Sequence, residues 1–134
     1  MPRSLTLAGI ELTEDGSILR AEIDLPYDIY VLSQAFKRTL QQRKAWGLSH
    51  IVFDSRCFGP VELSLKILLG VEIATIYQAL VPEKDVRVAI VVSARHLTDE
   101  RPASDTFSEL DLPILITSDP AQAQQWVSQS SIVA

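Results

Sequence analysis

Two short apolar runs, 51–53 and 86–92, of which the second is interrupted only by Arg87, lie on either side of a longer apolar segment of helical length at 61–81. Runs of this kind are typical of interior strands, which are covered on both faces of a sheet and so lack the alternation of a half-exposed strand. Strands joined by a helical crossover run parallel, because the helix carries the chain back to the edge where the first strand began. The chain is therefore predicted to be an α/β protein with helices packed on a largely parallel sheet.

The beginning of the chain predicts an antiparallel hairpin. Its first strand is indicated by four apolar residues: Leu5, Leu7, Ile10 and Leu12. The apolar residues stand at odd positions before Ala8 and Gly9 and at even positions after them, and a bulge would explain this change of parity. Residues 14–16, Glu-Asp-Gly, supply turn chemistry, since glycine adopts positive φ angles without strain. Residues 19–25 alternate between apolar and charged side chains, so the second strand is expected to bury one face only.

The remaining elements follow from apolar periodicity and from residues typical of helix ends. Asp28 and Asp119 fit N-caps, Pro60 fits the first position of the second helix, and Gly47 ends the first. Helices are therefore expected over 28–46, 61–81, 104–110 and 120–129, with a last strand at 114–116. The element order is β-β-α-β-α-β-α-β-α. This order predicts one domain over residues 1–134, with a single mixed, mostly parallel sheet of about five strands and about four helices.

Charge and composition exclude several classes of protein. The formal net charge of −5 argues against a nucleic-acid binder, because phosphate contacts need a basic face. The single cysteine, Cys57, excludes an intrachain disulfide and a zinc site built on several thiolates. Glu62, Lys66 and Glu72 interrupt segment 61–81, so a membrane-spanning helix is not expected. No secretory signal is recognised near the N-terminus, and we expect a cytoplasmic protein that binds no metal and no cofactor.

Several segments resemble the STAS superfamily, in its SpoIIAA-like branch, which is grouped with Sec14-like lipid-binding folds. The resemblance rests on Ile51–Asp54 leading into a helix, on strand Arg87–Val91 and on Ala123–Val127 after the last strand. In anti-sigma antagonists of that superfamily, a serine or threonine at a helix N-terminus is phosphorylated to switch partner binding. The resemblance implies such a role for Ser55, beside Asp54. The alternative is that Asp54 and Ser55 satisfy the amides of the loop and helix end.

The carboxyl ends of parallel strands are the usual ligand edge of an α/β sheet. The residues predicted at this edge as a candidate interaction or ligand site are Asp54, Ser55, Cys57, Gly59 and His96. A nucleophile pair formed by Cys57 and His96 would need the imidazole within hydrogen-bond reach of the sulfur. The alternative is that Cys57 packs as a small apolar residue.

Segment 61–81 is apolar almost all round, which predicts that more than its own chain covers it. We therefore expect a non-enzymatic interaction or regulatory module that self-associates as a homodimer and that has a protein partner. The alternative is a small carrier of an apolar or lipid-like ligand, with residues 61–81 lining the pocket. An enzyme using Cys57 and His96 is the third hypothesis. Segment 27–60 carries five basic and two acidic residues, so its helix is a docking face for an acidic partner or a membrane, or simply a solvated face.

Overall fold

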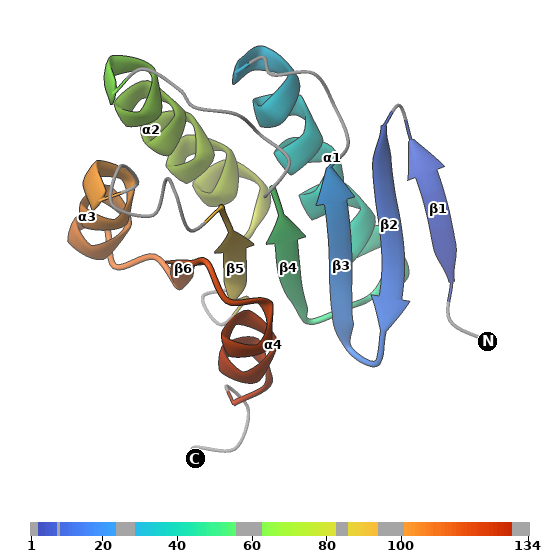
Figure 1. Cartoon of the computed structure of the whole chain (residues 1–134). Coiled ribbons are helices and arrows are strands. Elements are labelled where there is room, and N and C mark those ends of the chain that lie inside the picture. Colours follow the sequence, from blue (N-terminus) through green and yellow to red (C-terminus); the bar gives the residue numbers. More distant parts are fainter. Residues whose placement is uncertain are drawn as a thin grey trace.

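The structure is a computed structural model that describes residues 3–7, 9–23, 29–55, 63–82, 86–93 and 101–129. Within these residues, one sheet contains six strands: β1 (Ser4–Leu7), β2 (Ile10–Asp15), β3 (Ile18–Ile23), β4 (His50–Asp54), β5 (Val88–Val91) and β6 (Ile114–Thr117). The strand order in space is the order in sequence, β1 to β6 (Figure 1). Strands β1 to β3 are antiparallel and β3 to β6 are parallel, which confirms the predicted α/β class and the mixed sheet.

The prediction of a single first strand with a bulge is wrong. Residues 4–15 form two strands, with Leu7 paired to Ile10 across a two-residue turn, so the sheet has six strands rather than five. Gly9 lies in that turn with a φ of 86°, a conformation that glycine adopts without a steric penalty. A two-residue turn reverses the chain while both arms keep their apolar side chains on the same face. The parity change near Gly9 was therefore the sign of a hairpin.

Four helices are described: α1 (Ile29–Trp46), α2 (Leu63–Leu80), α3 (Arg101–Glu109) and α4 (Pro120–Ser128). The predicted stop at Gly47 is confirmed, since Gly47 has a φ of 68° and its N–H donates to the Lys44 carbonyl at 3.1 Å. The predicted N-cap Asp119 is also confirmed, because its carboxylate accepts from the Ala121 N–H at 2.9 Å. Helix α3 begins three residues before the predicted start at Ser104. None of the described helices is long and apolar enough to cross a membrane.

The sheet separates two cores of unequal size. Helices α1, α2 and α3 cover one face, and α4 lies on the other (Figure 1). Alternate residues of each strand point to opposite faces, so Phe53 and Ile90 belong to the larger core whereas Val52 and Val91 belong to the smaller one. This explains why strands β4 and β5 are apolar without alternation.

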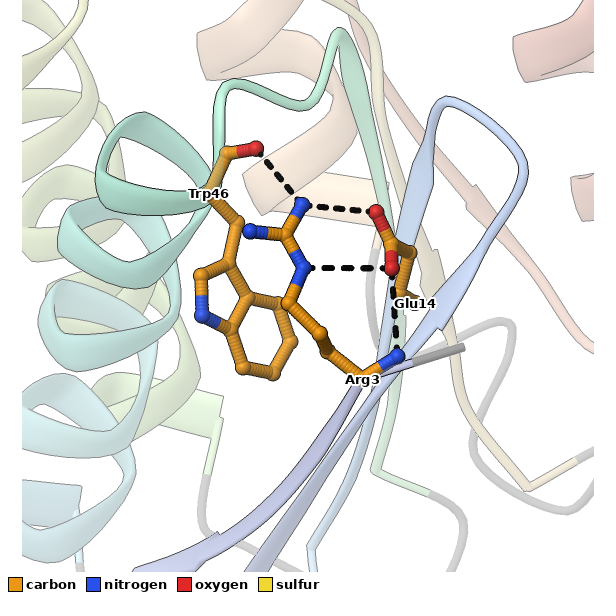
Figure 2. Close-up of polar contacts among 3 residues, drawn as sticks. All are labelled: Arg3, Glu14 and Trp46. Carbon is orange, nitrogen blue, oxygen red and sulfur yellow. Dashed lines mark hydrogen bonds and ion pairs between the residues drawn. The ribbon is translucent and has the colours of Figure 1, made fainter. Parts of the chain in front are cut away.

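Arg3 joins the first hairpin to the end of α1 (Figure 2). Its guanidinium lies 5.2 Å from the Trp46 ring centroid, and Nη2 donates to Glu14 Oε2 at 2.7 Å and to the Trp46 carbonyl at 3.0 Å. The Arg3 backbone N–H also donates to Glu14 Oε1 at 3.1 Å. These side-chain and backbone hydrogen bonds from Arg3 lower the pKa of Glu14 from 4.5 to about 2.

We expect Glu14→Gln to remove part of the acid sensitivity of folding. The Glu14 pKa of about 2 in the folded protein is lower than the ordinary 4.5, so the carboxylate's contribution is complete above that ordinary value. It is lost as the pH falls towards 2, because the unfolded chain then binds more protons. Urea unfolding at about pH 6 and about pH 3 measures this, with Glu11→Gln on the same strand as the control. Equal acid dependence in wild type and Glu14→Gln would contradict the assignment.

Candidate interaction surface

The predicted ligand edge contains a serine that is already engaged inside the sheet. Both the Ser55 N–H and its Oγ donate to the Val91 carbonyl, at 2.9 and 3.1 Å, and the residue is buried. The predicted alternative, in which Asp54 and Ser55 satisfy amides of the loop and helix end, involves residues outside the described ones, and within those ranges the Ser55 hydroxyl donates to a carbonyl of β5. Cys57, Gly59 and His96 lie outside the described residues.

Polar residues at the end of β6 organise the start of α4. Thr117 Oγ1 donates to Gln122 Oε1 at 2.6 Å and accepts from the Asp119 N–H at 3.2 Å. The carbonyl of Thr117 accepts from the Val92 N–H at 2.9 Å. Thr117 and Asp119 therefore have a structural role, because their side chains organise the first turn of α4.

Three acidic side chains form a row on the sheet face that α4 partly covers. Helix α4 contacts β4, β5 and β6 and reaches β3, where Arg20 Nη1 donates to Gln124 Oε1 at 2.6 Å, whereas Glu11 and Glu22 on β2 and β3 are exposed. The strand register places Glu11 beside Glu22, and Glu22 beside Asp54, in one row across the sheet. Among the described residues, no group of three or more His, Cys, Asp or Glu has an arrangement that could hold a metal ion. The row is therefore an acidic surface, and like charges side by side destabilise a sheet slightly.

The outer face of α2 carries large apolar side chains in contact with solvent. Helix α2 packs between α1 and α3 and buries Leu69, Ile73 and Tyr77. Leu68 and Val71, one turn apart, remain 51% and 47% exposed. Over residues 68–82 the only charged side chain is Glu72. The predicted all-round apolar helix is thus only partly covered by its own chain within the described residues.

A groove of about 530 Å³ lies between the second halves of α1 and α2. Its lining is mainly apolar, with amide and ammonium groups among it: Leu40, Gln41, Lys44, Ala45, Gln78, Ala79, Leu80 and Pro82. Leu40 is buried, whereas Lys44, Ala79 and Pro82 are exposed. None of the lining residues that the structure describes carries a carboxylate. The groove is open to solvent. Its lining suits an apolar side chain that is flanked by acidic residues.

One side of the groove continues into a basic stripe on α1. Lys37, Gln41 and Lys44 follow the four-and-three spacing of a single helix face and are exposed. Arg43 has a different role, since it is buried and its Nη1 donates to the Leu48 carbonyl at 2.9 Å. The stripe matches the basic face predicted for the first helix, and the structure adds that this face borders the groove.

Sequence reasoning placed the candidate site at the carboxyl edge of the sheet and missed the groove. The groove joins residues 40–45 with residues 78–82, which only the packing of α1 against α2 brings together. A signal for the exposed part of α2 was present, because segment 61–81 is apolar almost all round. In comparisons of the chain with protein-family models, with curated proteins and with solved structures, no match is found, so the STAS-like resemblance stays a prediction from sequence.

Proposed function

We propose that this protein is a non-enzymatic interaction module that self-associates through the outer face of α2. The observation that carries the proposal is the pair Leu68 and Val71, both about half exposed in a helix segment with a single charged residue. Depletion of charge and exposure of large apolar side chains are the marks of the centre of a protein interface. A regulatory role towards a further protein, as in STAS-like modules, is part of the same proposal.

Further support comes from the hydroxyl groups at the carboxyl ends of the parallel strands, within the described residues. The Ser55 hydroxyl and the Thr117 hydroxyl are both committed to hydrogen bonds within the fold. Catalytic groups need a proton or a lone pair directed at a substrate. The described part of this edge therefore favours a structural role.

A carrier of an apolar ligand is the second candidate, and the groove between α1 and α2 favours it. Its volume of about 530 Å³ falls in the range of small-molecule sites, roughly 300–1,000 Å³. Several of its lining residues are solvent-exposed, whereas a carrier encloses most of its ligand. A bound lipid or metabolite in native mass spectra of protein purified from its own cells would favour the carrier.

The double variant Leu68→Asp/Val71→Asp tests self-association. We expect a wild-type dimer whose dissociation constant rises at least about 100-fold in the variant, because four apolar side chains are replaced by mutually repelling charges. Sedimentation velocity over a concentration series measures the change. The matched control is Ala121→Asp/Gln125→Asp, two exposed positions of α4 on the opposite face of the sheet.

Circular dichroism checks that both double variants keep the helical content of the wild type. A wild type that stays monomeric up to roughly 100 µM would refute the proposal. So would a Leu68→Asp/Val71→Asp variant that dimerises as tightly as the Ala121→Asp/Gln125→Asp control.

A further inference from the structure

The end of α3 presents an apolar side chain between two carboxylates. Leu110 follows the last residue of α3 and is 45% exposed, and Glu109 and Asp111 on either side of it are also exposed. We call residues 109–111 the α3 tip. The α3 tip therefore combines an exposed apolar side chain with negative charge. The groove between α1 and α2 would complement both, since it has an apolar lining and a lysine.

The α3 tip is built against local preference. Asp111 has a φ of 54°, and among the described residues it is the only one other than glycine with a positive φ. Its N–H donates to the Ser108 carbonyl at 3.1 Å, and the Leu112 N–H donates to the Phe107 carbonyl at 2.9 Å, a helix end at which glycine is the usual residue. Glu109 and Asp111 also bring negative charge to a helix C-terminus, where cations are favoured. Such departures from local preference are expected where a residue serves an interaction.

The groove offers the complementary chemistry. Leu40, Ala79 and Leu80 provide apolar lining, and Lys44 is the one charged side chain among the lining residues that the structure describes. Gln41 and Gln78 add amide donors on the α1 side and the α2 side. An inserted leucine would lose its contact with water, while its flanking carboxylates would meet Lys44 at the rim.

The fold brings the groove and the α3 tip to the same end of the molecule. Helices α1, α2 and α3 each precede a parallel strand, so their C-terminal ends lie at the edge where those strands begin. Helix α2 lies between α1 and α3 (Figure 1). A two-fold axis parallel to α2 would therefore set the groove of each copy opposite the α3 tip of the other.

We propose that the occupant of the groove is the α3 tip of a second copy of this chain. Leu110 enters the apolar lining, Glu109 and Asp111 pair with Lys44, and the outer faces of the two α2 helices pack between the two reciprocal contacts. This inference rests on the proposed self-association and adds its geometry and its charge pairing.

A charge exchange in the full-length protein tests the pairing by sedimentation equilibrium. Lys44→Glu alone and the tip variant Glu109→Lys/Asp111→Asn alone are each expected to raise the dissociation constant of the dimer at least about 10-fold. The triple variant that combines them restores opposite charges and is expected to return within about 3-fold of wild type. Arg38→Glu, an exposed reversal of equal size outside the groove lining, is the control and stays within about 2-fold.

Asp111→Gly separates the interaction from a structural role. Glycine relieves the positive φ and removes the charge at the helix end, so the melting temperature of the dilute protein is expected to rise by about 2–4 °C. The same variant is expected to weaken the dimer, because the carboxylate that faces Lys44 is gone. A residue that served folding alone would not lose association while gaining stability.

The outcomes separate the two proposals. If Leu68→Asp/Val71→Asp dissociates the dimer while the charge reversals leave its dissociation constant unchanged, the groove assignment is wrong and self-association through α2 stands. If the wild type is monomeric, both proposals fail. A native mass spectrum in which Lys44→Glu releases a bound small molecule would assign the groove to a ligand and overturn the pairing with Leu110.

Discussion

Replacing Phe36 by alanine is expected to lower the free energy of unfolding by about 3–5 kcal/mol. Phe36 is fully buried on α1, and its ring meets the Phe53 ring of β4 edge to face, with centroids 5.5 Å apart and an interplanar angle of 77°. The substitution removes a large apolar surface and leaves a cavity between helix and sheet. The loss is a large share of the roughly 5–15 kcal/mol that stabilises a domain.

Urea unfolding of Phe36→Ala, Phe53→Ala and the double variant measures both the loss and the coupling of the two rings. We expect the double variant to lose less than the sum of the single losses, by about 0.5–1.5 kcal/mol for the ring pair. Phe36→Leu, which keeps most of the volume, serves as the control with a smaller loss. Strict additivity would show that the rings are stabilised independently. Because Leu40 lies one turn from Phe36, a loosened α1 is also expected to weaken the dimer.

Val127→Asp is expected to detach α4 and to lower the free energy of unfolding by at least about 4 kcal/mol. Val127 and Ala123 have no exposed surface and pack on Val52, Ala89 and Val91 in the smaller core. A carboxylate at that position would be buried among the apolar side chains of the smaller core. Within the described residues, α4 is the one helix of that core, so no neighbouring helix can shift to cover the loss.

Trp126 reports this change directly. Its ring centroid lies 4.9 Å from the Arg87 guanidinium, and its carbonyl accepts from Arg87 Nη1 at 2.8 Å. Detachment of α4 is expected to shift the tryptophan fluorescence to the red, with Trp46 as a constant background. Gln125→Asp, two residues earlier and exposed, is the control. Unchanged fluorescence and stability in Val127→Asp would mean that α4 does not seal this face.

The sequence predicted those elements whose signals are local. The runs at 51–53 and 88–91, the stop at Gly47 and the cap at Asp119 each depend on a few neighbouring residues, and the structure contains all of them. The predicted hairpin with its turn near Gly16 is present as β2 and β3, whereas the hairpin of β1 and β2 was missed because a parity change at Gly9 fits a bulge as well as a turn. Only the pairing of Leu7 with Ile10 separates the two.

The candidate surface was less accessible to prediction because it depends on packing. Leu68 and Leu69 are adjacent in sequence, yet one is half exposed and the other buried, and only the positions of α1 and α3 decide which. The positive φ of Asp111 carries no compositional signal, since aspartate is frequent at ordinary helix ends and turns. The Arg3–Glu14–Trp46 contact likewise joins residues more than forty positions apart.

The sequential order of the strands has a consequence for synthesis on the ribosome. Each strand pairs only with the strand before and after it in sequence, so the sheet can extend in step with translation, at about 5–20 residues per second. The smaller core does not follow this rule. Val52 and Ala89 remain uncovered until Val127 leaves the exit tunnel, which happens after every strand has emerged. The nascent chain therefore carries an apolar strip on β4 and β5 that stays without its helix until the end of α4 is released.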